Sequence, residues 1–495
     1  MNIKTFNKYY LYLTVFLVGA VILIIEITGT RIVAPFFGTT VYVWSSLIGV
    51  TLMALTAGYF IGGWLSDRKP SSNWLFAVIL LTAVPVFIIQ FISAGVLQYA
   101  DELGPKMGSL AGAAVLFVLP LLLLGIVSPY AVKISVIELK DAGKTAGTLY
   151  GISTIGSFLG AISAGFYLIP FLGIRAILDI MTAVLILLPS VWYVINWKKW
   201  RVVVIVFVSA VLLLLAYKPR AHANINNGFK VLCDRQTRYS RLKIIETPDN
   251  YRFLFMDNAL QTVYNASSNE FSIGYISMFE KAISMMPSAR HALVIGLGGG
   301  GISTVLAKHG LEVDNVEVDP VIAGAASEFF GFSGKVIIDD GRHYVRNHKQ
   351  KYDLIFLDAY NGFSIYQYML TKEAFAEMAD CLSPGGILTV NTVGKLSIEG
   401  THGMIYDRLT MAVVKTLSSV FKNTAVKADS DGICNFVYYA SAAPFIKPAG
   451  DIDVVQVTDG ELITDDRNCV DNITSGVIEK WRKQEMKNAG RIFLF

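Results

Sequence analysis

Long apolar stretches are the feature that most limits what this chain can fold into. Seven of them lie in its first half, at residues 9–29, 41–65, 74–97, 110–137, 145–169, 175–196 and 202–217. Most reach the roughly 20 residues that a helix needs to cross a bilayer, and the last is shorter. The first is too long for a signal peptide and has no small-residue cleavage site. We therefore expect a transmembrane helical domain of about seven spans over residues 1–220.

Charge divides the chain at the same place. Only 16% of the residues are charged, against about 25% in a typical soluble protein. Residues 1–223 hold 15 Lys and Arg and 7 Asp and Glu. The remaining residues hold 27 Lys and Arg and 31 Asp and Glu, a net charge of −4. Phosphate binding needs a basic face, so this acidic second half makes a nucleic-acid partner unexpected.

Ionisable and small residues mark specific points in the apolar half. Charged groups inside a bilayer need a partner or a watery cavity, so Glu26 and the nearby Arg31 are membrane-domain candidates, either for function or for structural pairing. Glycine pairs at a spacing of four let helix backbones approach closely. Three such pairs predict helix packing: Gly58 with Gly62, Gly147 with Gly151, and Gly156 with Gly160.

The second half changes from one pattern to another near residue 266. Residues 229–264 alternate in part and contain turn signals at 248–250 and 257–258, which predicts a small β-strand domain over residues 221–265. From Ser267 onward, helices and strands alternate, which is typical of a parallel, doubly wound α/β sheet. We expect a Rossmann-like domain over residues 266–495.

The strongest motif is the glycine run in "HALVIGLGGGGISTVLAKHG", residues 291–310. An apolar strand leads into the run, and a helix follows it. Glycine permits a tight turn and a close approach of the backbone to a ligand at the N-terminus of the helix. We assign Gly296, Gly298 and Gly300 to cofactor binding on this basis.

Acidic residues follow the predicted strands, where ligands of such sheets bind. Glu317 and its competitor Asp319 lie about 20 residues after the glycine run, the position that hydrogen-bonds ribose hydroxyls in nucleotide-binding units. Asp340, followed by Gly341, can accept a hydrogen bond from an adenine amino group. Asp358 ends a buried strand, where a carboxylate can take a proton from an amine. The alternatives are surface carboxylates at a strand end for Glu317 and Asp319, a solvated turn for Asp340, and a supporting or capping role for Asp358.

At this point the sequence resembles the spermidine synthase family of aminopropyltransferases, in particular the bacterial branch with a fused multi-spanning membrane domain. The segments 26–50, 58–68 and 153–161 are similar to that membrane half. "MDNALQ", residues 256–261, resembles the family's LDGxxQ, which implies that Gln261 contacts the cofactor. The resemblance further implies that Asp340 lies near adenine and that Asp358, as the first Asp of the DSSD motif, activates the amine. Tyr360, in the same motif, is assigned with Asp358 to catalysis.

Three departures from the family pattern put the substrate in doubt. Gly299 replaces the Asp that holds the amino group of decarboxylated S-adenosylmethionine, and Asn361 replaces the second Asp of DSSD. The family's Tyr falls on Ile273, with Tyr275 the near substitute. Tyr275 and Asn361 are therefore our substrate-binding candidates. Losing two carboxylates weakens a site for cationic polyamines, because buried ammonium groups need paired charge.

The resemblance implies a bundle of transmembrane helices, a small β-domain and an S-adenosylmethionine-dependent transferase fold. The expected activity is aminopropyl transfer to a polyamine-like amine, with decarboxylated S-adenosylmethionine or S-adenosylmethionine as co-substrate and without a metal. A methyltransferase and a non-catalytic transporter or sensor are the alternatives. The expected partners are a small amine and the lipid bilayer; a homodimer is one option for the assembly.

The expected location is the cell (inner) membrane, but two arguments disagree about the soluble domain. Lys and Arg cluster in alternate loops, which places the N-terminus in the cytoplasm and, after seven spans, the soluble domain outside. Adenosyl sulfoniums are made in the cytosol, which favours the cytoplasmic side. We give the second argument the greater weight.

Overall fold

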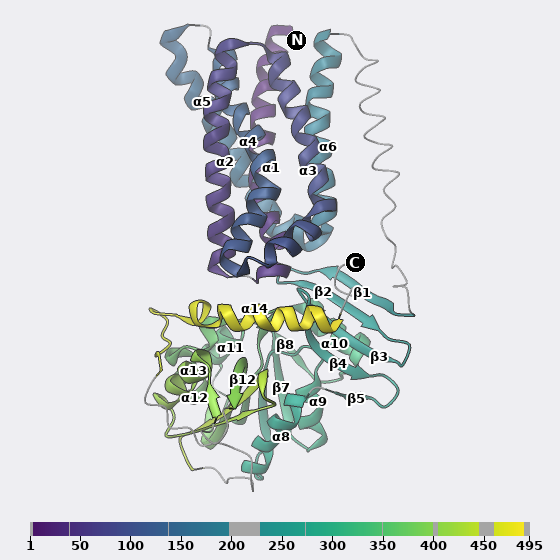
Figure 1. Ribbon diagram of the computed structural model, residues 1–495, viewed down its shortest axis with the longest axis vertical. Helices are drawn as coiled ribbons and strands as arrows, with labels where there is room; N and C mark the ends of the chain where they lie inside the picture. The colour runs from purple at the N-terminus through teal and green to yellow at the C-terminus, as the bar shows by residue number, and fades with distance from the viewer. Residues whose placement is uncertain are drawn as a thin grey trace. The chain divides into compact units, whose positions relative to one another are not determined.

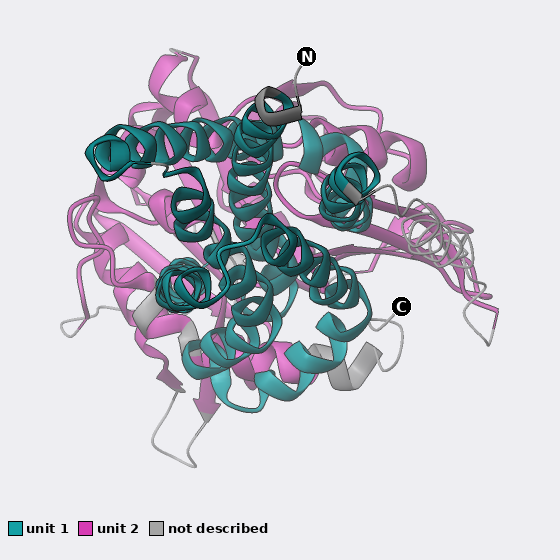
Figure 2. Cartoon of the chain, turned by 90° about the horizontal axis from the view of Figure 1, so that it is seen from above, with its two compact units in different colours: residues 1–221 teal, residues 222–495 magenta. Residues whose placement is uncertain are grey.

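The computed structural model describes residues 3–38, 40–136, 138–197, 228–272, 274–348, 350–398, 404–444 and 460–489. The chain divides into two compact units, residues 1–221 and 222–495 (Figure 2). Each unit has an apolar core of its own.

The first unit is a bundle of long helices (Figure 1). They are α1 (Ile3–Phe37), α2 (Val41–Arg68), α3 (Ser72–Asp101), α4 (Gly104–Ser135), α5 (Ala142–Ser163) and α6 (Ile169–Trp197), with a 3₁₀ turn at Leu139–Asp141 and a π-helical segment at Ala164–Leu168. Apolar side chains lie both inside and outside this bundle: Leu75 and Leu124 are fully buried, whereas Phe60 is 76% exposed. A helix that is apolar on its outer face as well is typical of a membrane span.

Within the described residues, five helical runs are long and apolar enough to cross a membrane. They are Phe6–Phe37, Val41–Arg68, Ser72–Asp101, Gly104–Ser135 and Leu139–Asn196. The predicted number of seven spans is therefore wrong. The stretches 145–169 and 175–196 fall into one run of 58 residues, in which helical segments follow one another without an intervening loop but the backbone is non-helical at Gly173. This run bends at Gly173, which has a left-handed φ of 75°. The stretch 202–217 lies outside the described residues.

Glycines set how closely the helices of the bundle approach. A Cβ at Gly58 or Gly62 would collide with the backbone of α4, and one at Gly156 or Gly160 with the backbone of α1. The predicted packing role is confirmed for these two pairs. For Gly147 and Gly151 it is wrong, because a Cβ at either would meet nothing within 4 Å.

Several polar groups of the bundle have partners. Lys133 forms an ion pair with Asp67 at 2.6 Å, and Gln90 Nε2 donates to Asp179 Oδ1 at 3.0 Å. Such pairing lowers the cost of placing polar groups in a bilayer. Glu26 and Arg31 both lie half-buried in α1, and their mutual pairing stays a prediction.

The second unit begins with a small antiparallel sheet of five strands in sequential order. These are β1 (Lys230–Gln236), β2 (Arg241–Glu246), β3 (Tyr251–Met256), β4 (Ala259–Asn265) and β5 (Glu270–Phe271). Asn250, Asp257 and Asn258 have positive φ at the tight turns, where the sequence carries its turn signals. The prediction of a small β-strand region before the α/β fold is confirmed.

A larger, mostly parallel sheet follows, in the order β14-β15-β12-β9-β6-β7-β8 (Figure 1). Its strands are β6 (His291–Ile295), β7 (Glu312–Glu317), β8 (Val336–Ile338), β9 (Tyr352–Leu357), β12 (Leu382–Ile398), β14 (Asn423–Ala428) and β15 (Gly432–Ser441), with β13 (Met404–Tyr406) paired to β12. The helices are α8 (Gly274–Met285), α9 (Gly301–Lys308), α10 (Pro320–Phe330), α11 (Gly341–Asn347), α12 (Lys372–Asp380), α13 (Arg408–Ser418) and α14 (Val470–Ala489). Short β10 (Tyr360–Asn361), β11 (Ser364–Ile365) and a 3₁₀ turn (Gln367–Met369) complete the unit.

The strand order places a topological switch point between β6 and β9. The chain adds β7 and β8 on one side of β6 and then β9 and β12 on the other, and all these neighbours pair in parallel. Ligands of such sheets bind at the carboxyl ends of the strands beside the switch point. The sheet itself therefore directs the search for a site to the residues that follow β6, β7 and β9.

A buried arginine fixes the segment that leads into α14. Arg342 of α11 is hydrogen-bonded to Glu377 of α12 at 2.8 Å and to Asp465 at 2.6 Å. These paired, charge-assisted contacts hold residue 465 against the core of the unit.

Candidate active site

The glycine run forms the turn between β6 and α9, and its backbone needs glycine for two reasons. Gly296, Gly298 and Gly300 have φ values of 92°, 54° and 84°, in the region that other residues rarely adopt. A Cβ at Gly296 would overlap the carbonyl oxygen of Asp358, and one at Gly300 would lie 2.5 Å from the ring of Phe332. The turn thus combines a left-handed backbone with no room for side chains.

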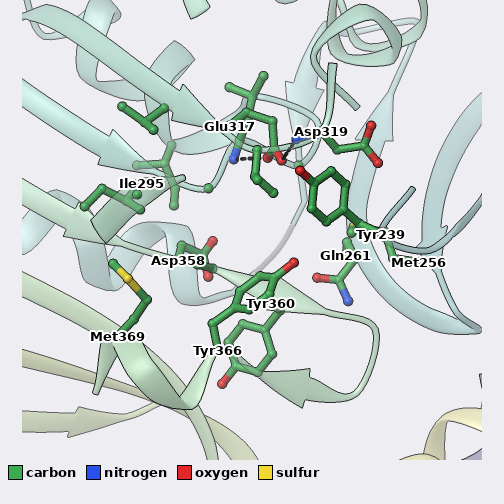
Figure 3. Close-up of a pocket in the computed structure, with 18 of the residues that line it drawn as sticks. Tyr239, Met256, Gln261, Ile295, Glu317, Asp319, Asp358, Tyr360, Tyr366 and Met369 are labelled. Atoms are coloured by element: carbon green, nitrogen blue, oxygen red, sulfur yellow. Dashed lines mark hydrogen bonds between the residues drawn. The ribbon is translucent and has the colours of Figure 1, made fainter. Parts of the chain in front are cut away.

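Glu317, at the end of β7, ties this turn to the start of the next helix, because each of its carboxylate oxygens accepts one backbone N–H (Figure 3). Oε2 accepts the N–H of Leu297 at 3.0 Å, and Oε1 accepts the N–H of Asp319 at 2.9 Å. Burial raises the pKa of Glu317 to about 7, although these hydrogen bonds favour the charged form. Each oxygen keeps a second lone pair for a ligand.

Asp319 carries a buried oxygen without a protein partner. Its Oδ1 caps α10 by accepting the N–H of Val321 at 2.9 Å. Its Oδ2 has no hydrogen-bond partner among the described residues, and the residue is only 2% exposed. Buried carboxylate oxygens are normally hydrogen-bonded, so this one fits a ligand hydroxyl. The sequence favoured Glu317 over Asp319 as the residue that binds the ribose. In the structure, the oxygen without a partner among the described residues belongs to Asp319.

Asp340 is anchored while keeping one acceptor position open. Its Oδ1 accepts the N–H groups of Arg342 and His343 at 3.0 Å, which caps α11. Its Oδ2 accepts the Tyr368 hydroxyl at 2.6 Å. A carboxylate has about four acceptor sites, so one remains on Oδ2 for a donor such as an amino group. Gly341 is the first residue of α11. A Cβ at this position would lie 2.4 Å from Cγ2 of Ile295, so only glycine fits.

Asp358 follows β9 and is held from two sides. Tyr275 of α8 donates its hydroxyl to Oδ2, and Asn391 of β12 donates Nδ2 to Oδ1, each at 2.9 Å. Burial raises the pKa of Asp358 above its usual value, and the two hydrogen bonds oppose that shift. A carboxylate whose pKa is raised is a better proton acceptor than one in water.

The remaining predicted residues lie close by. Gln261 of β4 donates Nε2 to the carbonyl of Gly362 at 3.2 Å. Tyr360 accepts the N–H of Val393 at 2.6 Å through its hydroxyl oxygen, and its ring meets that of Trp481 at a centroid distance of 6.1 Å. The backbone of Asn361 pairs with Ser364 in the β10–β11 hairpin.

These residues surround two neighbouring cavities. The first, which we call the adenosyl cavity after the ligand proposed below, is open to solvent. Of the predicted residues, those that line it are Gln261, Tyr275, Gly296, Gly298, Glu317, Asp319, Asp340, Gly341, Asp358 and Tyr360, whereas Gly300 does not; the side chain of Asn361 lies outside what the structure describes. The second, which we call the acceptor cavity, lies beside it and is also open to solvent. Both are lined by Gln261, Tyr275, Asp358 and Tyr360, so they meet at Asp358.

Sequence reasoning missed several lining residues. They are mainly aromatic or neutral polar: Tyr239, Thr262, Tyr366, Tyr368, Asn391 and Trp481. Asn391 carried a usable signal, since it is a polar residue at the end of the apolar strand "GILTVN". Figure 3 shows Tyr239 and Tyr366 among the residues that line the adenosyl cavity. Neither follows a strand of the parallel sheet, so the rule that ligands bind at strand ends does not predict them. No group of three or more potential metal ligands occurs in the part of the chain that the structure describes.

The fold, the glycine turn and the strand-end acids define a doubly wound α/β domain with a candidate ligand site at its switch point. Residues 275–428 match the family model described as "Spermine/spermidine synthase domain". The second unit therefore carries a spermine/spermidine synthase domain, and the resemblance inferred from the sequence is confirmed for this part of the chain.

Individual relatives are distant. The chain is 36% identical over 127 residues to a polyamine aminopropyltransferase of Vibrio vulnificus, covering 24% of this chain and 42% of the relative. It is 28% identical over 190 residues to one of Thermoplasma volcanium, covering 35% and 66%. The match thus spans less than two thirds of each of these curated relatives. A solved spermidine synthase from Thermotoga maritima is 22% identical with a TM-score of 0.37, covering 55% of this chain and 96% of that one.

Proposed function

We propose that the second unit transfers an alkyl group from an adenosyl sulfonium to an amine. The preferred form is aminopropyl transfer from decarboxylated S-adenosylmethionine. In this proposal the small β-domain, residues 221–265, supplies Gln261, and the catalytic domain, residues 266–495, supplies the remaining groups. The observation that carries the proposal is the meeting of two cavities at one buried carboxylate, Asp358. A two-substrate transfer needs that arrangement.

The described residues fit an adenosyl ligand. The glycine turn places no side chain between its backbone and a ligand next to α9. Asp319 Oδ2 offers an acceptor without a partner among the described residues to a ribose hydroxyl. Asp340 Oδ2 has one acceptor position left for an adenine amino group. Asp358 takes a proton from the acceptor ammonium and leaves a neutral amine. The amine nitrogen then forms a bond to the carbon next to sulfur as the C–S bond breaks, and the electron pair stays on sulfur. Tyr275 and Asn391 orient Asp358 for this step.

Methyl transfer from intact S-adenosylmethionine is a second candidate because of the surroundings of Gly299. A Cβ at this position would lie 2.6 Å from Cγ2 of Thr262, and the Gly299 N–H donates to Thr262 Oγ1 at 3.0 Å. A carboxylate side chain, such as the family uses to hold the aminopropyl ammonium, does not fit here without movement. That loss weakens discrimination against the intact co-substrate.

Product analysis tests both candidates. The purified full-length chain is incubated with either sulfonium and a panel of amines. Methylthioadenosine as the product indicates aminopropyl transfer, and S-adenosylhomocysteine indicates methyl transfer. Formation of neither, together with tight binding of an adenosyl thioether, would favour a ligand-sensing role.

We expect Glu317→Ala to weaken binding of an adenosyl thioether by roughly 1–3 kcal/mol, or about 5- to 150-fold, because charged hydrogen bonds are lost. The wild-type affinity should rise with pH up to about 7 and then level off, since ligand hydroxyls bind the ionised form of a group whose pKa is about 7. Glu317→Gln should remove this pH dependence. Calorimetry measures both effects. Glu312→Gln, an exposed residue at the other end of β7, is the control, and equal affinities in wild type and Glu317→Ala would refute the assignment.

We propose that the first unit spans the cell membrane and that the second faces the cytoplasm, where adenosyl sulfoniums are made. With the N-terminus inside, this requires an even number of crossings. The run Leu139–Asn196 has 58 residues, about 87 Å of helix against a hydrocarbon core of about 30 Å. A bend at Gly173 would let this run cross twice, which makes the total even.

Reporter fusions after Asn196 and after Phe495 should both be active in the cytoplasm. A C-terminal reporter active only outside the cytoplasm would contradict this placement. The enzyme proposal would then need an exported co-substrate.

A further inference from the structure

The acceptor cavity contains a single ionisable carboxylate. Strands β4, β12 and β15 and helices α8 and α14 contribute to its wall. Its lining residues are Leu260, Gln261, Val263, Ser272, Gly274, Tyr275, Asp358, Tyr360, Asn391, Val393, Asn435 and Trp481. Apart from Asp358, they are apolar, aromatic or neutral and polar. Among the described residues, the lining therefore offers one negative charge to a ligand.

An aromatic wall borders the cavity on the side of the C-terminal helix. Trp481 of α14 meets Phe363 edge-on at a centroid distance of 5.0 Å, and Tyr360 at 6.1 Å. Phe363 is itself only 3% exposed, so it supports the indole from behind. Leu260, Val263 and Val393 extend the apolar surface. Such a wall favours an apolar ligand body through the area that it removes from water.

Beside Asp358 lies a second acceptor whose partner is missing from the protein. Asn391 donates Nδ2 to Asp358, and because a carboxylate only accepts, this bond fixes which end of the amide is the oxygen. Asn391 Oδ1 is buried, with no hydrogen-bond partner among the described residues, in a side chain that is 4% exposed. A buried amide oxygen at the cavity wall fits an N–H donor of the ligand. Asp358 and Asn391 together can thus hold one amine nitrogen.

A second ammonium on the same ligand would find no matching charge among the lining residues that the structure describes. Burying an ammonium without a partner is unfavourable, because its hydration is lost and no ion pair replaces it. Asp429 lies next to Gly274, where a Cβ would be 3.0 Å from both of its carboxylate oxygens, but it does not line the cavity. The distribution of charge therefore separates monoamines from diamines.

We infer that the acceptor is a primary monoamine with an apolar body, rather than a diamine or polyamine. This inference rests on the proposed transfer to an amine. The amine nitrogen binds between Asp358 and Asn391 Oδ1, and the apolar body lies against Trp481. Asp358 removes one proton from the bound ammonium. The nitrogen lone pair then forms the new C–N bond, the C–S bond electrons neutralise the sulfonium to a thioether, and the product leaves as a secondary ammonium while Asp358 returns its proton to water.

Two amines of equal size test the inference. Hexylamine and pentane-1,5-diamine have the same number of non-hydrogen atoms and differ in a terminal methyl against a terminal ammonium. Their affinities are measured by calorimetry on the full-length protein in detergent, saturated with an adenosyl thioether, and their turnover is measured with each sulfonium. We expect hexylamine to bind about tenfold more tightly or better, which corresponds to 1.4 kcal/mol.

Each outcome decides something different. Equal or tighter binding of the diamine, or no binding of either amine, would overturn the inference. Preferred binding of hexylamine without a product from either sulfonium would leave the inference standing and refute the proposed transfer. The binding readout therefore separates the two failures.

Variants of the cavity wall should shift the preference between hexylamine and pentane-1,5-diamine in predictable directions. Asn435→Asp adds a carboxylate of nearly the same shape and should raise the affinity for pentane-1,5-diamine about tenfold, with little change for hexylamine. Trp481→Ala should weaken hexylamine selectively, whereas Trp481→Phe should retain most of its binding. Asp429→Asn is the control and should leave the ratio of the two affinities unchanged. A selective loss of diamine binding in Asp429→Asn would mean that Asp429 serves a second ammonium, against the inference.

Discussion

Replacing Asp358 with Asn should reduce turnover by about 10²- to 10⁴-fold while leaving the binding of an adenosyl thioether unchanged. The size follows from the usual contribution of a positioned general base. The carboxylate lies where the two cavities meet, and burial raises its pKa, so it is suited to accept a proton from the acceptor ammonium. An amide of the same shape cannot accept that proton. Turnover under saturating substrates and calorimetry of the thioether measure the two effects.

The control is another aspartate of the same strand. Asp353, in β9, accepts hydrogen bonds from the N–H groups of Arg290 and His291 and from the Ser383 hydroxyl. It lines neither cavity. These bonds hold the pKa of Asp353 below its usual value, so Asp353→Asn should lower the free energy of unfolding but spare turnover. Unchanged turnover in Asp358→Asn would show that Asp358 is not a catalytic base.

A second large effect is expected at the glycine turn. Gly296→Ala should reduce thioether binding and turnover by roughly 10²-fold or more, since displacements near 1 Å at a reacting site have effects of that size. The new methyl group would overlap the carbonyl oxygen of Asp358, and the left-handed φ of 92° would add strain. The end of β9 must then move, and Asp358 with it.

Gly310→Ala separates the strain from the collision. Gly310 has a similar φ of 82°, but a Cβ there would meet nothing within 4 Å. This variant should lose only about 1–2 kcal/mol of unfolding free energy, the strain of a left-handed alanine, and keep its binding. Thermal unfolding and calorimetry on both variants make the comparison. Similar losses of binding in the two would mean that the fit of Gly296 under Asp358 is unimportant.

The parts of the site that sequence could predict are those that follow from strand ends. Gly296 and Asp358 come directly after β6 and β9, Glu317 is the last residue of β7, and parallel strands bring their carboxyl ends to one edge. Asn391 does not end its strand, because β12 continues to Ile398, but it is the polar residue that follows the run "GILTV" and could have been noticed for that reason. The Asp319 oxygen that has no partner among the described residues could not be predicted from the sequence. Which oxygen is left without a partner depends on how the backbone N–H groups are divided between Glu317 and Asp319.

Other features depend on contacts between distant segments. Trp481 is 121 positions beyond Tyr360, whose ring it meets, and its helix carries no motif that points to a ligand. In the first unit, hydropathy separated 145–169 from 175–196, and the kink at Gly173 lies between these two stretches although no loop does. A window of apolar residues reports length and composition, not where a helix bends. The sequence does not distinguish Gly173 from the other glycines of the first unit; its φ of 75° does.

The position of Trp481 near the end of the chain has a consequence for synthesis. The last residue of the adenosyl cavity in sequence is Met369, which is 112 residues before Trp481. At roughly 5–20 residues per second, a ribosome needs about 6–22 s to cover that interval. During this time a nascent chain has every adenosyl-cavity residue but not the indole beside Tyr360. A chain released within this interval lacks the indole beside Tyr360, and one that ends before Gly432 also lacks β15, which pairs with β12 in the central sheet.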